Sequence, residues 1–185
     1  MARGHSRLSS RAVRLLAVGM LTALAAFRPC GGHAASFAVK DLQVLGRAIA
    51  FLQSPPGSDA VIAIAYVPGD AASRRDAEDI LALIGAGLQA GRVTLRPRLV
   101  DINNLSAAGA TIVIAAAGAA GPRLSEATRA THALCVTTDT EAVRAGFCTM
   151  SITTEPLVKI LINHAVAEAA GVEFVTAFRM MIKEM

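Results

Sequence analysis

Two cysteines are the residues whose type and spacing most directly indicate chemistry. Cys135 and Cys148 each lie in a short apolar segment, at 133–136 and 147–152. If these segments are neighbouring strands, a disulfide between them closes a small loop and stabilises the chain by about 2 to 3 kcal/mol. The alternative is two buried free thiols, since a bridge also requires the two Cβ atoms to face each other. The export signal described below favours the disulfide.

The remaining chemistry-bearing residues do not form a catalytic motif. The sequence has no Gly-x-Ser-x-Gly elbow, no Walker loop and no His-Glu-x-x-His. His164 and Glu168 are four residues apart and make half a metal site, for which a solvated helix pair is the simpler interpretation. His132 with Cys135 and Cys148 offers three zinc-ligand types, but export favours the disulfide. We therefore predict no enzyme activity, no metal and no cofactor.

A few charged and glycine-rich positions have both ligand-binding and structural interpretations. Asp70 and Asp101 follow predicted strands, where α/β proteins often place ligand groups, but turn and capping roles also explain them. Arg74 and Arg75 open a predicted helix, where free N–H groups favour an anion, although neighbouring acids can compensate them internally. The Gly-rich loop 118–121 can approach a ligand closely.

The first 35 residues have the three-part pattern of a secretory signal peptide. Four arginines precede an apolar run from Leu15 to Phe27, and small residues follow at Gly31, Gly32, Ala34 and Ala35. The run of 13 residues is shorter than the roughly 20 needed to span a bilayer, which argues against a permanent anchor. We predict cleavage after Ala34 or Ala35 and export to the periplasm. Cleavage would also remove Cys30 and leave one cysteine pair.

Removal of this segment changes the charge of the chain. Five of the 18 Lys and Arg residues lie in 1–35 with no acid, so the remaining 13 face 14 Asp and Glu and the formal net charge is −1. The mature part has neither a Lys/Arg run nor an aromatic platform, so we predict no nucleic-acid partner. Residues 36–185 are enough for one domain with a sizeable core.

The mature chain is predicted to alternate helices and strands. Ser36 is predicted to cap the first helix, and Asp41 is predicted to face water on that helix. Ser73 is predicted to open the second helix, and Gly91 to end it. Asn163 is predicted to cap the short helix near the C-terminus. The predicted helices are 37–52, 73–90, 125–131, 140–144, 164–170 and a last one over 174–182; 101–108 is predicted to be loop or short helix. The predicted strands are 60–66, 93–100, 111–115, one around Cys135, 148–153 and 157–162.

The spacing of the last two strands decides their pairing. Only Thr154, Glu155 and Pro156 separate them, a connection that requires an antiparallel hairpin rather than a crossover. The fold class predicted is therefore α/β: a single-domain mixed β-sheet flanked by helices, with a C-terminal β-hairpin and helix.

Phe174, Phe178 and Met181 form an apolar stripe at helical spacing on the last predicted helix. The stripe has two interpretations. It packs into the core, or it forms a partner groove or a dimer face, for which Met and Phe are well suited.

The mature chain resembles the YfiR-like family of periplasmic proteins. The resemblance covers the chain in outline, from an opening helix and the Pro55-Pro56 turn to a strand followed by Pro68-Gly69-Asp70. It is strongest near the end, where the following segments fall in the family's order: Leu134-Cys135-Val136-Thr137, Ala145-Gly146-Phe147-Cys148-Thr149-Met150, Val158-Lys159-Ile160-Leu161-Ile162-Asn163, Ala170-Gly171 and Phe174 to Met181.

The resemblance implies a periplasmic regulator without catalysis. Members bind the periplasmic sensor region of an inner-membrane diguanylate cyclase and keep its cyclic di-GMP output low. On this interpretation Phe174, Phe178 and Met181 are candidate partner-binding residues, and a second copy of the chain is a further candidate partner. The main alternative is a periplasmic small-ligand-binding module, which the α/β alternation and the 118–121 loop favour; an exported enzyme and a structural envelope protein are the others.

Overall fold

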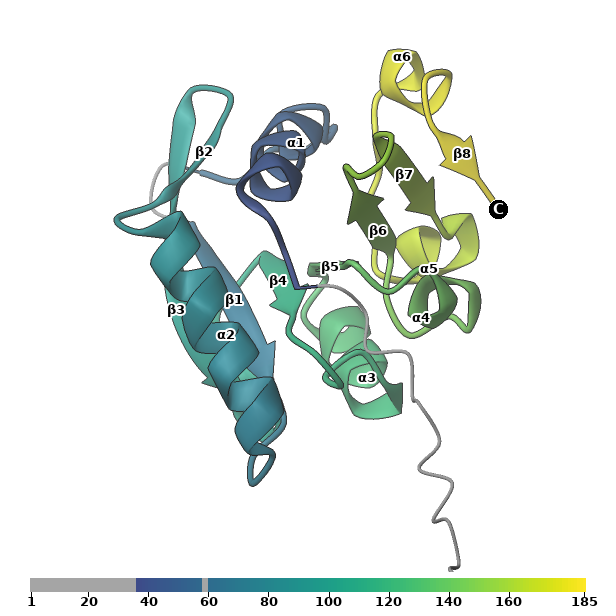
Figure 1. The fold of residues 1–185 in the computed structure, drawn as a ribbon. Helices are drawn as coiled ribbons and strands as arrows, with labels where there is room; N and C mark the ends of the chain where they lie inside the picture. The colour runs from purple at the N-terminus through teal and green to yellow at the C-terminus, as the bar shows by residue number, and fades with distance from the viewer. Residues whose placement is uncertain (1–35, 58–59) are drawn as a thin grey trace, which may run out of the picture. The chain divides into compact units, whose positions relative to one another are not determined.

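The computed structural model describes residues 36–57 and 60–185 of the chain (Figure 1). The predicted signal peptide, 1–35, lies outside the described residues. The helices are α1 (Val39–Ile49), α2 (Ala71–Ile84), α3 (Pro122–Ala130), α4 (Thr140–Arg144), α5 (His164–Ala169) and α6 (Thr176–Arg179), with a 3-10 helix η1 (Ile102–Ala108). The strands are β1 (Val61–Tyr66), β2 (Leu88–Ala90), β3 (Val93–Asp101), β4 (Ile112–Ala115), β5 (Leu134–Thr137), β6 (Met150–Thr153), β7 (Lys159–Ile162) and β8 (Lys183–Glu184).

The strands of the described residues form one mixed sheet in the order β2-β3-β1-β4-β5-β6-β7-β8. β3, β1, β4, β5 and β6 run parallel, β2 and β7 run antiparallel to β3 and β6, and β8 runs parallel to β7. The predicted α/β class, with a mixed sheet, flanking helices and a C-terminal hairpin, is confirmed. The predicted hairpin is β6–β7, in which Thr153 lies opposite Lys159 and Ser151 opposite Leu161.

The central strands are buried on both faces, which explains their continuous apolar sequences. Ile62 and Ile64 of β1 belong to the cluster that also contains buried residues of α1 and α2. Ala63 and Ala65, which alternate with them, belong to the cluster that contains buried residues of η1, α3 and α4. Successive side chains of a strand point to opposite faces, so helices cover the sheet on both sides.

The first helix is shorter than predicted and begins differently. α1 starts at Val39 after Ala38, and Ser36 does not cap it. Asp41 was expected to face water but is buried, with 5% of its surface exposed. Its Oδ2 accepts a hydrogen bond from the Ala38 N–H at 2.8 Å, which satisfies one of the free donors at the helix start. The cap therefore comes from inside the helix rather than from the residue before it.

The second helix was predicted correctly in place but wrongly at both ends. It starts after Asp70, whose Oδ1 accepts hydrogen bonds from the Ala72 and Ser73 N–H groups. It ends at Gly85, which has a positive φ of 62°, and Leu88–Ala90 forms the short strand β2 instead of a last helical turn. Gly91, the predicted helix stop, lies in the β2–β3 turn with the same positive φ. The three-residue strand is too short for its alternation to be visible in the sequence.

The last predicted helix, 174–182, is also wrong in extent. Only Thr176–Arg179 is helical, and Phe174 instead forms an isolated antiparallel bridge with Leu52. The chain then runs into β8, which the sequence analysis missed. Pairing with distant segments, which helical spacing does not report, overrides the local pattern here.

The segment after α1 and the C-terminal segment hold each other by backbone and aromatic contacts. The Gln53 N–H donates to the Glu173 carbonyl and the Val175 N–H donates to the Phe51 carbonyl, each at 2.9 Å. The Phe51 ring stacks on Phe178 with centroids 5.1 Å apart. Two parts of the chain more than 100 residues apart in sequence therefore form one packed unit.

Candidate functional site

A groove of about 520 Å³ lies where α4 faces the β6–β7 hairpin and the segment before β8. Its size falls within the range of small-molecule and side-chain binding pockets. The polar residues that line it are Thr140, Arg144, Ser151, Thr153 and Lys159, and the apolar ones are Val158, Ile160, Leu161, Met181 and Ile182.

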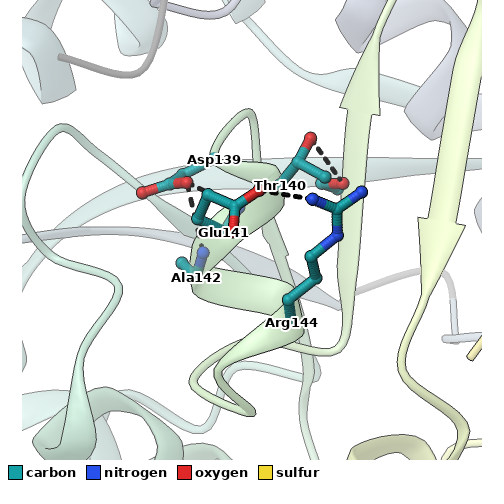
Figure 2. Close-up of polar contacts among 6 residues, drawn as sticks. Asp139, Thr140, Glu141, Ala142 and Arg144 are labelled. Carbon is teal, nitrogen blue, oxygen red and sulfur yellow. Dashed lines mark hydrogen bonds and ion pairs between the residues drawn. The ribbon is translucent and has the colours of Figure 1, made fainter. Parts of the chain in front are cut away.

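A capping carboxylate fixes the position of α4 beside this groove. Asp139 Oδ1 accepts hydrogen bonds from the Glu141 N–H at 2.9 Å and the Ala142 N–H at 3.1 Å (Figure 2). The Asp139 N–H in turn donates to Thr137 Oγ1 at the end of β5. The helix is thereby tied to the strand that precedes it. Because Thr140 and Arg144 are four residues apart, they lie on the same face of α4.

The contacts that these two side chains make within the chain contribute little net stability. The Ser151 hydroxyl lies 3.5 Å from that of Thr140, which is long for a hydrogen bond between hydroxyls. Arg144 Nη1 lies 2.6 Å from Glu141 Oε1, and the two side chains are 52% and 76% exposed. An ion pair so open to water is worth at most about 1 kcal/mol. Both contacts are marked in Figure 2, and both can be exchanged for contacts with a bound group at little loss.

The register of the hairpin places the other polar side chains. Ser151 and Leu161 form one directly opposite pair, and Thr153 and Lys159 form the next. Opposite residues of an antiparallel pair project from the same face, and residues two apart do so as well. Leu161 packs in the cluster that contains α4 residues, so this set faces α4. Lys159 is exposed and makes no ion pair with a described residue.

Exposed apolar side chains line part of the groove. Val158, just before β7, is 61% exposed, and Met181, just after α6, is 68% exposed. Their sequence neighbours Leu157 and Met180 are 69% and 83% exposed. Large apolar residues that gather at a groove, rather than lie scattered over the surface, are typical of interaction sites.

The predicted disulfide is present. Cys135 of β5 is bonded to Cys148, with Cα atoms 5.0 Å apart, so the alternative of free thiols is wrong. Both residues are fully buried. The bridge closes the loop that contains α4, and it therefore supports the wall of the groove.

The structure separates the three residues predicted for partner binding. Phe174 and Phe178 are 4% and 5% exposed and lie 5.2 Å apart, centroid to centroid, in the core. Phe174 and Phe178 therefore pack into the core, the first of the two interpretations of the stripe, and neither side chain is open to a partner. Met181 is exposed and lines the groove, and partner binding through it stays a prediction.

The structure does not assemble His132 or His164, the histidines in its described part, into a metal site. No group of three or more His, Cys, Asp or Glu side chains in the described part of the chain could hold a metal ion. Cys135 and Cys148 are bonded to each other, and His132 Nδ1 lies 3.2 Å from the Ala170 carbonyl oxygen. His164 and Glu168 are exposed on α5.

The predicted ligand groups Asp70 and Asp101 lie at the ends of β1 and β3, and their carboxylates bind the backbone. Asp70 and Asp101 cap α2 and η1, as their structural interpretation holds. Asp76 of α2 accepts a hydrogen bond from the Ala117 N–H at 2.7 Å, which fastens the loop before Gly118 to the helix. These carboxylates make the start of α2 unfavourable for an anion.

Arg74 is also engaged within the chain. Its Nε lies 2.7 Å from Glu78 Oε1, its Nη1 donates to the Tyr66 hydroxyl, and its guanidinium lies 4.8 Å from the Tyr66 ring centroid. The hydrogen bond that Arg74 donates to Glu78, followed by the interaction with Tyr66, raises the pKa of Arg74 above its usual value. The Arg74 guanidinium is therefore already bonded to Glu78 and Tyr66 of the same chain, as the structural interpretation of this residue holds.

Five residues of the groove were not predicted from the sequence as site residues: Thr140, Arg144, Ser151, Thr153 and Lys159. A signal was present in the hairpin, where Ser151 and Thr153 alternate with the apolar residues of one strand. Alternation shows that such residues share a face. It does not show that α4 stands opposite that face, and this depends on the crossover and the disulfide.

Compared with models of protein families and with curated proteins, the chain has no match. Among solved structures, it is similar to the crystal structure of a conserved domain protein from Vibrio cholerae O1 biovar El Tor strain N16961, with 12% sequence identity and a TM-score of 0.47. The similarity covers 79% of this chain and 59% of that chain. No helix among residues 36–57 and 60–185 combines the length and apolar character needed to cross a membrane.

Proposed function

We propose that this protein is a periplasmic regulator that binds the periplasmic sensor region of an inner-membrane diguanylate cyclase and represses it. The observation that carries the proposal is the groove beside α4, which is lined by the exposed apolar side chains of Val158 and Met181. The signal-peptide pattern and the disulfide support an oxidising, exported location. The resemblance of the sequence to the YfiR-like family supports the choice of partner.

Repression across the membrane requires no catalytic step. A protein that binds only the inactive state of a receptor withdraws it from the active pool. To move the receptor from almost fully active to almost fully inactive, the regulator must bind the inactive state about 10⁴-fold more tightly than the active one. The proposal therefore needs a discriminating surface rather than an active site.

The test is the intracellular level of cyclic di-GMP in the source organism. Deletion of the gene should raise it and overexpression should lower it. A Met181→Glu variant should behave like the deletion, because it places a charge on the apolar border of the groove. Leu83→Glu is the matched control, since Leu83 is 44% exposed on α2, which packs on the opposite face of the sheet from α4.

Immunoblots of the periplasmic fraction should show equal amounts of both variant chains. An unchanged cyclic di-GMP level after both deletion and overexpression, under more than one growth condition, would refute repression of a cyclase. If the Leu83→Glu variant also loses repression, the groove is not the surface that binds the partner.

A second candidate is a periplasmic module that binds a small ligand. The groove's volume and its two cations and three hydroxyl side chains favour this candidate. A thermal-shift screen of the purified mature chain with carboxylate and phosphate metabolites tests it. A rise in Tm that Lys159→Ala abolishes would support small-ligand binding.

A further inference from the structure

The groove beside α4 is positively charged although the mature chain is not. Arg144 and Lys159 line it, and none of the described residues that line it is acidic. The formal charge of residues 36–185 is −1, so these two cations are not part of a general basic surface. A concentration of one sign of charge at a hollow favours a group of the opposite sign.

Both cations are available to such a group. Lys159 makes no ion pair with a described residue, and Arg144 contacts only Glu141 among the ion pairs of the described chain. Glu141 is 76% exposed, so water already screens that pair and its loss is inexpensive. A guanidinium also has five N–H donors and can keep one partner while it binds a second.

The hydroxyl groups that line the groove together with the cations suit a carboxylate. Thr140 and Ser151 are separated by 3.5 Å, so neither hydroxyl makes a strong bond to the other. Each can donate to an anionic oxygen, and hydrogen bonds to charged acceptors are about twice as strong as neutral ones. Thr153 lies opposite Lys159 on the same face and adds a third hydroxyl.

The border of the groove is apolar and adaptable. Val158, Met181 and Ile182 line it beside Lys159. Methionine has a flexible, polarisable side chain that adapts to the shape of its partner. The combination therefore suits an anionic group that is carried next to an aliphatic one. Val158 and Met181 are 61% and 68% exposed, which suits a protein segment at the surface better than an enclosed small ligand.

We propose that the groove binds a segment of the protein partner that places an Asp or Glu carboxylate between Arg144 and Lys159 and an adjacent aliphatic side chain against Val158 and Met181. This inference rests on the proposed function, because it names the chemistry of the segment that the regulator recognises. Thr140 and Ser151 then donate to the carboxylate, and Arg144 exchanges part of its contact with Glu141 for the new one.

The test uses a photo-cross-linking amino acid at position 158 of the full-length chain, expressed in the source organism. The cross-linked peptide is identified by mass spectrometry. We expect an exported segment of a membrane protein with Asp or Glu within a few residues of the cross-link. Lys159→Glu should lower the cross-link yield about tenfold or more, and Lys159→Arg should retain it.

Reciprocal charge exchange makes the test specific. Replacement of the identified acid by Lys should abolish the cross-link to the natural chain and restore it to the Lys159→Glu variant. Arg75→Glu is the matched control for the charge change, since Arg75 is an exposed arginine on α2. Thermal unfolding should be the same for Lys159→Glu and the natural chain, because Lys159 makes no ion pair with a described residue that folding would lose.

The outcomes separate this inference from the proposed function. A cross-link to a diguanylate cyclase that depends on Lys159 supports both. A Lys159-dependent cross-link to an acidic segment of another protein supports the inference and refutes the cyclase as partner. A cross-link to the cyclase that Lys159→Glu leaves unchanged refutes the inference alone. No adduct, an adduct with a second copy, or a Tm increase with free citrate without any adduct refutes the inference.

Discussion

The aromatic rings near the C-terminus show how a single residue connects distant parts of the chain. Phe178 is 5% exposed, stacks on Phe51 and lies beside Phe174. Truncation of a buried Phe removes its burial and leaves a cavity, so Phe178→Ala should lower the free energy of unfolding by about 3 to 5 kcal/mol. Urea denaturation of the mature chain measures this.

Met180→Ala is the control for that change. Met180 is two residues away but 83% exposed, and its truncation should alter stability by about 0.5 kcal/mol or less. Equal losses for the two variants would mean that Phe178 does not pack in the core as described.

Gly46 permits a close approach between α1 and the β2 strand. A Cβ at this position would overlap the carbonyl oxygen of Gln89. Alanine normally stabilises a helix by up to about 1 kcal/mol relative to glycine. Here the overlap opposes that gain, and we expect Gly46→Ala to lower the free energy of unfolding by about 1 to 3 kcal/mol.

Gly57 provides the matched substitution. A Cβ there meets nothing within 4 Å, and its φ is not positive. Gly57→Ala should therefore be neutral or slightly stabilising in the same urea experiment. A Gly46→Ala variant more stable than the natural chain would show that α1 does not pack on β2 at this distance.

At the scale of the elements, Asn163 joins α5 to α4. Its Oδ1 accepts from the Val166 N–H at the start of α5, and its Nδ2 donates to the Val143 carbonyl of α4 at 3.0 Å. Asn163→Ala removes a helix cap, worth about 1 kcal/mol, and one hydrogen bond to the Val143 carbonyl, worth about 0.5 to 1.5 kcal/mol. That carbonyl keeps the Gly146 N–H as a donor, so we expect a loss of about 1.5 to 2.5 kcal/mol by urea denaturation.

Asn104 tests whether this loss is specific. It is an exposed asparagine in η1, so Asn104→Ala should change stability by about 0.5 kcal/mol or less. A similar small effect for Asn163→Ala would contradict its role between the two helices.

The disulfide stabilises the segment that carries α4. It joins residues 13 apart in sequence, and a loop of this length is worth about 3 kcal/mol in the chain-entropy model. The double variant Cys135→Ala, Cys148→Ala should lose about this much, plus a small cavity term. Thermal unfolding of the oxidised and the fully reduced natural chain should show a difference in the same direction. Equal Tm values would mean that the bridge adds nothing to the stability of this unit.

At the scale of the whole molecule, the segment after α1 and the segment before α6 should separate in one step. The Gln53 and Val175 N–H groups donate to carbonyls across the same pair of segments. We predict that hydrogen exchange gives both amides nearly the same opening free energy, because one separation exposes both. Phe178→Ala should accelerate both to a similar degree, and a change in only one of them would show that the segments open independently.

The elements that the sequence predicts correctly are those whose pattern depends only on residues close together in the chain. The β1 and β4 strands are continuous apolar runs, and α4 was predicted with its observed bounds, Thr140–Arg144. The three-residue connection before Leu157 already required the β6–β7 hairpin, because no crossover is that short. The cap at Asn163 is similarly a local signal.

The errors occur where a distant segment overrides a local pattern. Leu88–Ala90 leaves the helical pattern to pair with β3, and Phe174 leaves it to pair with Leu52. Asp41 was predicted to face water because its side chain is charged, but the packing of α1 on the rest of the chain buries it. Helical spacing depends only on residues that are close in sequence, so it cannot predict contacts with distant segments.

By itself, the sequence determined the α/β class, the C-terminal hairpin and the two cysteines able to form a bridge, because periodicity, connection length and residue type are local properties. Only the tertiary structure decided that Cys135 and Cys148 are bonded, that Phe174 and Phe178 are core residues, and that Met181 is exposed. It also brought Arg144 of α4 and Lys159 of β7 to one groove. A site is a set of distances between residues far apart in sequence, and the packing of helices on the sheet sets those distances.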